Sequence, residues 1–166
     1  VAHFLSAIKI TGVNAVAEDL DVILIAAGAI IPVYAIPDWQ YINLREVLLY
    51  PGTFDEDFDQ GGADRHIAGM VGTGPMQDVM IITKWQLRQG FVNEHNTNNT
   101  AIHEFVHLID KMDGTVDGVP GIILERKYIN QWKHIMDSNI QQMKRNGSDI
   151  NMYAATNHAE FFAVVS

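Results

Sequence analysis

The sequence predicts an α+β fold in which a small antiparallel or mixed sheet is followed by several helices. Three features support this class. An apolar, helix-like segment comes first, the strand-like runs after it are short, and the strongest helical periodicities lie in the second half of the chain. This order of helix, strands and helices differs from the regular alternation of strand and helix in parallel α/β folds.

Length and composition fit one globular domain with its own hydrophobic core. The chain has 166 residues, of which 48% are apolar and 19% are charged, whereas a disordered chain would be more polar. It begins with Val1 rather than Met and stops at Ser166 inside an apolar, helix-like stretch. We therefore expect residues 1–166 to form a single domain that is a fragment of a longer protein, truncated at both ends.

Charge and cysteine content argue against several classes of function. Eleven Lys and Arg residues against 20 Asp and Glu residues give a formal net charge of −9, which disfavours binding to duplex nucleic acid or to an anionic membrane surface. The longest apolar run, from Val22 to Ala35, is too short to span a bilayer. Because the chain has no cysteine, any metal site must use His, Asp or Glu.

The first half of the chain contains the predicted strands. Asp21–Tyr34 is rich in Ala and Ile and is expected to be a buried helix ending near Pro32, although its apolar run would also suit a strand. Gly72–Pro75 is either a hairpin connection or a place where the backbone closely approaches a ligand. The predicted strands are Glu46–Tyr50, His66–Val71 and Val79–Thr83, and the acidic stretch Asp55–Asp59 is a predicted loop.

Helical signals dominate the second half. Cap-forming residues at Asn96–Thr100 precede apolar residues at helical spacing, and Gly114 is expected to end this helix. Leu124–Arg145 is predicted to be a long amphipathic helix, and Asn157 is predicted to cap a last helix. A stripe of large apolar side chains on the long helix is expected to pack in the core: Trp132, Met136, Ile140 and Met143.

The most specific motif is H-E-x-x-H, formed by His103, Glu104 and His107. Residues four apart on a helix share one face, so two imidazoles can reach one cation at the usual zinc–nitrogen distance of about 2.0–2.1 Å. Glu104 flanks these histidines, where a carboxylate can accept a proton from water activated by a metal. The motif therefore predicts a zinc site on an active-site helix.

Two carboxylates are candidates for the third zinc ligand. Asp110 lies three residues after His107 on the same helix face, and Glu160 lies far along the chain on the last predicted helix. Three ligands from one straight helix rarely converge on one point, whereas a nearby carboxylate often accepts the other N–H of a ligand imidazole. This favours Glu160 as the ligand and Asp110 as that acceptor, although by spacing alone Glu160 could equally be an ordinary surface carboxylate.

Three blocks of the chain match motifs of a known family. Val47–Phe54 looks like V-x-V-Y-P-x-x-F, and Ala101–Gly114 with Gly118–Pro120 is similar to I-H-E-F-A-H-x-L-D-x-x-D-G…G-x-P. Met152–Val164 resembles Y-A-A-x-N-P-A-E-F-F-A-V. Together these blocks resemble the Mlc titration factor A family of bacterial zinc-dependent peptidases, and the resemblance covers most of the chain.

The resemblance implies a gluzincin-like, cytoplasmic zinc peptidase with a zincin-like α+β fold and aminopeptidase-type activity on small peptide substrates. It implies that His103, His107 and Glu160 bind Zn²⁺ and that Glu104 is the general base. Tyr153 matches a tyrosine that stabilises the tetrahedral intermediate. Named members bind the glucose-responsive repressor Mlc, so a Mlc-like repressor is an expected partner through the resemblance alone.

The chain departs from the family pattern at two places. His158 stands where the family usually has Pro in the first turn of the last helix. A structural role is expected for His158, while a ligand role in a different geometry stays open. Gly69–Ile82 is longer and more polar than the matching family segment. Zincins commonly lay substrate along a strand at this place, so the substrate preference also stays open.

Two functions from different classes follow from these observations. The first is a zinc metallopeptidase in which Glu104 acts as the base on a zinc-activated water. The second is a non-catalytic zinc-containing module that binds a transcriptional regulator. Glu104 and Tyr153 are both present, and a structural zinc site needs neither, so the sequence favours the enzyme.

Overall fold

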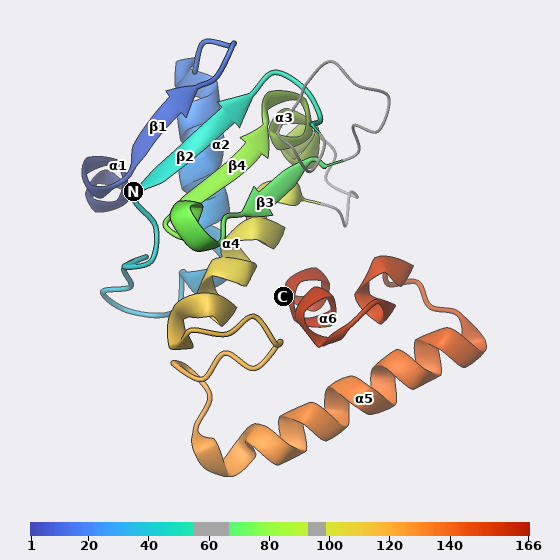
Figure 1. Cartoon of the computed structure of the whole chain (residues 1–166). Coiled ribbons are helices and arrows are strands. Elements are labelled where there is room, and N and C mark those ends of the chain that lie inside the picture. Colours follow the sequence, from blue (N-terminus) through green and yellow to red (C-terminus); the bar gives the residue numbers. More distant parts are fainter. Residues whose placement is uncertain (55–66, 93–98) are drawn as a thin grey trace.

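The computed structural model describes residues 1–54, 67–92 and 99–166 (Figure 1). The predicted acidic loop Asp55–Asp59 lies outside the described residues, as do His66 and most of the predicted cap cluster before Asn99. Within the described residues the chain forms a small sheet, a group of helices against that sheet, and a second group of helices below it.

The sheet has four strands and is mixed. Its strands are β1 (Lys9–Gly12), β2 (Glu46–Tyr50), β3 (Gly69–Val71) and β4 (Val79–Thr83), in the spatial order β1-β2-β4-β3. β1, β2 and β4 are parallel, whereas β3 pairs antiparallel with β4 at one edge. β2 and β4 lie where the sequence predicts them, and β3 is the last part of the strand predicted at His66–Val71. Gly72–Pro75 belongs to the connection between β3 and β4, as one of its two interpretations predicts.

The sequence analysis does not predict β1, and this strand changes the topology. β1, α2 (Asp19–Ile30) and β2 form a β-α-β unit with parallel strands, so the expected separation of strands from helices is wrong for this part of the chain. The four residues of β1 read Lys-Ile-Thr-Gly, which is too short a run to show strand alternation. The mixed α+β class with a small sheet is confirmed.

Six α-helices lie in the described part of the chain. α4 (Thr100–Asp110) and α6 (His158–Val165) begin directly after Asn99 and Asn157, whose side chains accept hydrogen bonds from the first turns, as expected of caps. The predicted helices Asp21–Tyr34 and Leu124–Arg145 correspond to α2 and α5 (Ile129–Asn146), each with a 3₁₀ turn at one end. α1 (Ala2–Ala7) and α3 (Lys84–Val92) are not predicted. None of the helices in the described ranges is both long and apolar enough to cross a membrane.

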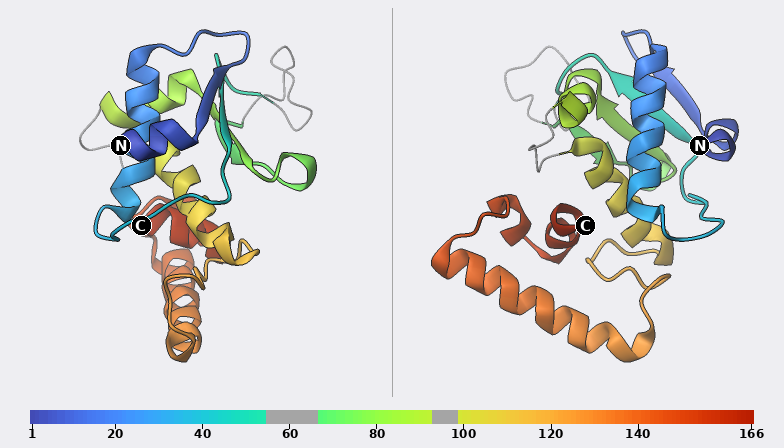
Figure 2. Two further views of the ribbon diagram at one scale, coloured as in Figure 1. Left: turned by 90° about the vertical axis from the view of Figure 1, so that its left-hand side faces the viewer. Right: turned by 180° about the vertical axis from the view of Figure 1, so that it is seen from behind.

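α2 and α4 pack behind the sheet, as the rear view in Figure 2 shows. Gly28 allows the two helices to cross closely, because a Cβ atom there would lie 2.7 Å from the Cβ of Ala101. The side chains that the strands and these helices bury together form the larger core, which includes Ile25, Val47, Leu49, Met80, Ile82, Phe105 and Leu108. Burial of these side chains holds α4 against the sheet.

A second, smaller core joins α5, α6 and the 3₁₀ turn Met152–Ala155. Met136, Ile140 and Met143 of the predicted stripe are buried there, and Trp132 packs against them, so the core interpretation of this stripe is confirmed. α4 contacts α6 from this second group as well as the sheet. α4 therefore lies between the two cores.

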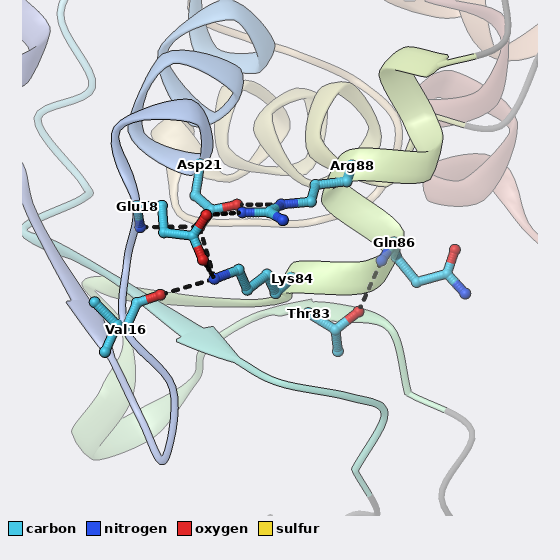
Figure 3. Close-up of polar contacts among 7 residues, drawn as sticks. All are labelled: Val16, Glu18, Asp21, Thr83, Lys84, Gln86 and Arg88. Carbon is cyan, nitrogen blue, oxygen red and sulfur yellow. Dashed lines mark hydrogen bonds and ion pairs between the residues drawn. The ribbon is translucent and has the colours of Figure 1, made fainter.

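Ion pairs between charged side chains join the start of α2 to α3 (Figure 3). The Asp21 carboxylate is fully buried, lies 2.7 Å from Arg88 Nε and 3.3 Å from Lys84 Nζ, and accepts the backbone N–H of Glu18. Burial by itself raises the pKa of Asp21, but these hydrogen bonds and cations outweigh burial and lower it below the ordinary value. Glu18, which is more exposed, completes the pairing with both cations.

Replacing Asp21 with Asn should destabilise the fold, because both cations then lose their buried partner. We expect the free energy of unfolding at neutral pH to fall by about 2–3 kcal/mol, less than for wholly buried pairs because the cations keep some solvent. The Asp19→Asn variant loses an exposed carboxylate in the same helical turn and should cost at most about 1 kcal/mol. Urea unfolding of the three proteins measures both values.

The same network predicts a pH dependence. The Asp21 carboxyl has a lower pKa in the folded than in the unfolded chain. The contribution of this carboxylate to the free energy of unfolding is therefore present in full above the unfolded pKa of about 3.9. It is lost as the pH falls below that value. Unfolding of the wild type and of Asp21→Asn should give free energies that converge as the pH falls below about 4. A constant difference down to pH 2.5 would contradict this assignment.

Candidate metal centre

α4 presents both histidines of the H-E-x-x-H motif on one face, as the sequence predicts. The Asn99 side chain accepts from the N–H of Ile102 and fixes the start of the helix. At its other end α4 continues into the 3₁₀ turn Lys111–Asp113. This turn ends at Gly114, whose φ of 101° is left-handed. These ends place His103, Glu104 and His107 in the middle of a regular helix.

Three side-chain atoms converge at this face. His103 Nε2 and His107 Nε2 lie 3.0 Å apart, and Glu160 Oε2 of α6 lies 3.1 Å from the first and 3.5 Å from the second. Ligands about 2.0–2.1 Å from a tetrahedral metal ion are about 3.3 Å apart. The spacing of the three atoms therefore fits a single metal ion, and within the described residues this is the group of three His, Asp or Glu side chains that does so.

Glu160 reaches the histidines because it lies in the first turn of α6, which begins directly after its cap Asn157. The Asn157 side chain caps α6 by accepting the N–H of Glu160 itself. Glu160 Oε2 is buried and has no hydrogen-bond donor of good geometry, although two imidazoles are close to it. Burial raises the pKa of Glu160, but the two imidazoles outweigh it and lower the pKa to about 2. A buried anionic oxygen with no donor is what a bound cation would satisfy.

Glu104 lies beside these atoms in a tightly enclosed position. It is buried, and burial first, then the charge of Glu160, raises its pKa to about 7, while His103 and a hydrogen bond from the N–H of Val71 act in the opposite direction. Gly69 of β3 leaves the room that Glu104 occupies, since a Cβ there would lie 2.9 Å from both Cγ and Oε1 of Glu104. The edge strand therefore shapes the position of this carboxylate. The sequence alone does not predict that Gly69 leaves space for Glu104 or that the Val71 N–H donates to it.

Tyr153 approaches the same site from the 3₁₀ turn before α6. Its ring centroid lies 6.1 Å from that of His103, and the side chain remains about half exposed. Partial burial, the charges of Glu160 and Glu104 and a hydrogen bond to Glu160 raise the pKa of Tyr153. The hydroxyl therefore stays protonated and can donate a hydrogen bond.

Asp110 is fully buried but does not join the convergent atoms. Its Oδ2 accepts the N–H of Gly118 at 2.8 Å, and burial raises its pKa to about 6. Its Oδ1 and the Nδ1 of His107 are both buried without a hydrogen-bond partner. Of the two candidate carboxylates, the structure brings Glu160 rather than Asp110 to the histidines.

His158 faces away from the site. Its Nε2 lies 2.7 Å from Asp137 Oδ1, so it links the start of α6 to α5. The structural interpretation of His158 agrees with this contact.

A cleft of about 390 Å³ contains the site. One wall is β3 and the segment after it, from Gly69 to Thr73, and the opposite wall is formed by Tyr153 and the start of α6. The floor is the face of α4 that carries His103, Glu104 and His107, and it continues to Lys111. The sequence analysis does not single out Lys111, although its position four residues after His107 places it on the same helix face.

Gly118 fixes α6 relative to α4. Its N–H donates to Asp110 Oδ2, and its carbonyl accepts a hydrogen bond of 2.7 Å from Trp132 Nε1 of α5. Its φ of 76° is left-handed, and a Cβ at this position would lie 2.3 Å from the carbonyl oxygen of His158. The absence of a side chain at Gly118 therefore lets α6 approach closely enough for Glu160 to reach the histidines.

Comparison with known proteins agrees with this geometry. The family model described as glucose-regulated metallo-peptidase M90 matches residues 1–166. The chain belongs to the M90 metallopeptidase family. The family implies a divalent metal, and the group formed by His103, His107 and Glu160 is the candidate place for it.

M90 relatives include proteins named Mlc titration factor A. The chain is 32% identical to the protein of that name from Escherichia fergusonii over 136 residues, which are 75% of this chain and 50% of the relative. It is 32% identical to the one from Salmonella arizonae, with 75% and 53% covered. An uncharacterized protein of Synechocystis is 28% identical over 145 residues, with 76% and 49% covered. The chain thus spans about half the length of these relatives.

Gly118→Ala should weaken metal binding, because the added Cβ would push α6 and Glu160 away from α4. Gly147→Ala is the matched control: Gly147 has a similar φ of 72°, but nothing lies within 4 Å of its Cβ position. Both variants should lose about 1–3 kcal/mol of stability from a backbone with positive φ, which at Gly147 (ψ 179°) suits almost only glycine, and Gly118→Ala adds the clash with the His158 carbonyl. Titration with Zn²⁺ against a chelator should show weaker binding in Gly118→Ala alone. Equal metal affinity in the two variants would contradict this role.

Proposed function

We propose that this chain carries the catalytic centre of a zinc-dependent metallopeptidase. The observation that carries the proposal is the convergence of His103 Nε2, His107 Nε2 and Glu160 Oε2, with the Glu104 carboxylate in the same cleft. Two imidazoles and one carboxylate form a donor set that catalytic zinc uses in peptidases, with a further position left open. Membership of the M90 family supports the same function.

Zinc held by these three side chains would supply Lewis-acid chemistry, which polarises a peptide carbonyl and lowers the pKa of water toward about 7. Glu104 takes a proton from the attacking water as the new C–O bond forms. It then gives that proton to the amine nitrogen as the peptide C–N bond breaks. The cavity left by Gly69 and the N–H of Val71 hold the Glu104 carboxylate in position for both transfers.

Tyr153 and Asp110 assist in different ways. The Tyr153 hydroxyl, at the edge of the cleft, donates a hydrogen bond to the carbonyl oxygen on which negative charge develops. In this proposal Asp110 orients the His107 imidazole by accepting its Nδ1–H, a hydrogen bond that the structure does not contain. Asp110 Oδ1 and His107 Nδ1 are both buried without a partner, so this bond would satisfy both atoms.

The type of substrate and the location follow from the sequence resemblance. We propose aminopeptidase-type cleavage of peptides by a cytoplasmic protein. Aminoacyl anilides with a free amino group should be hydrolysed, and their N-acetylated forms should not. The alternative proposal is a non-catalytic zinc module that binds a Mlc-like repressor, and it is favoured only by the name that some relatives carry.

Glu104→Gln tests the general base and separates the two proposals. Gln has the size of Glu but cannot accept the proton, so hydrolysis should fall by at least about 10²-fold while Zn²⁺ content stays near that of the wild type. Metal analysis and anilide hydrolysis measure the two quantities on the same sample. Wild-type turnover in Glu104→Gln would defeat the assignment of the base. A zinc-loaded wild type with no hydrolysis of any peptide would favour the non-catalytic module.

Glu160→Ala and Asp110→Ala test the ligand set. Glu160→Ala removes an atom that lies against both imidazoles, so most Zn²⁺ should be lost to a micromolar chelator and activity abolished. Asp110→Ala removes the proposed support of His107 and the acceptor of the Gly118 N–H, but no convergent ligand atom, so Zn²⁺ affinity should fall by about 10–100-fold. Parallel Zn²⁺ titrations against one chelator compare the variants. A loaded Glu160→Ala together with an empty Asp110→Ala would reverse the two roles.

A further inference from the structure

Lys111 places a cation in the cleft. The proposed mechanism gives this cation no function. It follows α4 directly and lies four residues after His107, so it continues the face that carries the two histidines. Its side chain lines the cleft together with those histidines and Glu104. The other titratable side chains discussed above that line the cleft, Glu104, Glu160, Tyr153 and the two histidines, already have roles in the proposed function.

The Lys111 ammonium is held by neutral acceptors. Its Nζ donates to the carbonyl oxygens of Gly72 at 2.6 Å and Gln77 at 2.7 Å. An ammonium has three hydrogens, and no described residue accepts the third. Within the described ranges no carboxylate lies within ion-pair distance of Nζ. The charge of Asp78, which pairs with Arg45, offsets only part of the burial that lowers the pKa of Lys111.

The position of this cation along the cleft is defined by β3. Gly72, which accepts from Nζ, comes directly after Val71, whose N–H is bonded to Glu104. One residue of extended chain spans about 3.3 Å. With the hydrogen bonds at the two ends of this path, the ammonium lies within the length of about three substrate residues from the carboxylate that acts on the scissile bond.

We propose that Lys111 binds a carboxylate of the peptide substrate, so that the site prefers peptides with a negative charge within about three residues of the cleaved bond. This proposal rests on the proposed peptidase function and deepens it. A partly buried cation whose acceptors among the described residues are neutral carbonyls gains a charge-assisted hydrogen bond when an anionic group enters the cleft. The carboxylate comes either from the C-terminus of a short peptide or from an Asp or Glu side chain.

The test uses pairs of short peptides that differ only in charge. One arm compares tripeptides that end in a free acid with their C-terminal amides. The other arm compares amidated peptides with Glu or Gln at each of the three positions on either side of the cleaved bond. In the wild type, kcat/KM should favour the charged member of one arm by about 10-fold or more, the scale of a hydrogen bond between charged groups. Which arm shows the preference identifies the source of the carboxylate.

Lys111→Met then assigns the preference to this side chain. Met keeps an unbranched side chain but loses the charge, so the preference should disappear while neutral peptides are cleaved within about 3-fold of the wild-type rate. Lys144→Met, which removes the same charge from the exposed end of α5, should keep the full preference. This control accounts for the change in net charge.

The outcomes that overturn the proposal are distinct from those that overturn the peptidase function. Equal rates for charged and neutral peptides in both arms, or a preference that persists in Lys111→Met, would refute carboxylate binding by Lys111. A large loss of activity on neutral peptides in Lys111→Met would show that the side chain only clamps the segment between β3 and β4. No hydrolysis of any peptide by zinc-loaded wild type would instead refute the proposed function itself.

Discussion

The burial of α4 is the constraint on which the rest of the structure depends. Eight of the eleven residues of this helix are buried. Phe105 and Leu108 pack into the larger core with the sheet and α2. The face of α4 with His103 and His107 lies against α6. A helix enclosed in this way cannot rotate or slide without disturbing the larger core and its contact with α6. Packing therefore keeps the two imidazoles in the relative geometry that a single metal ion requires.

The candidate site lies where the two cores meet, and that is also where unsatisfied polar atoms gather. Five buried side-chain atoms in the described residues have no hydrogen-bond partner, and three of them belong to His107, Asp110 and Glu160. Each such atom ordinarily costs about 1–3 kcal/mol. A bound cation would satisfy Glu160 Oε2, whereas His107 Nδ1 and Asp110 Oδ1 are not among the convergent atoms. Membership of the M90 metallopeptidase family independently implies a divalent metal.

Glycines make this junction possible at three places. Gly28 lets α2 cross α4, Gly69 leaves room for Glu104 below β3, and Gly118 lets α6 approach α4. In each case the neighbour occupies the space of a missing Cβ, and only Gly118 also needs a left-handed backbone. The site is thus built by close approach of main chains, while its chemistry comes from a few polar side chains.

Elements with local signals could be predicted from the chain alone: a cap within Asn96–Thr100, the cap Asn157, the core stripe of α5 and the shared face of His103 and His107. The sequence did not reveal β1 or α3, because a four-residue strand and a mostly polar helix with Gly90 inside carry little periodicity. Only the tertiary structure decided that Glu160 rather than Asp110 meets the histidines, and that Gly69 and Val71 support Glu104. The physical reason is that these contacts join segments far apart in the chain. Their distances are set by how two cores pack against one helix, which no local pattern encodes.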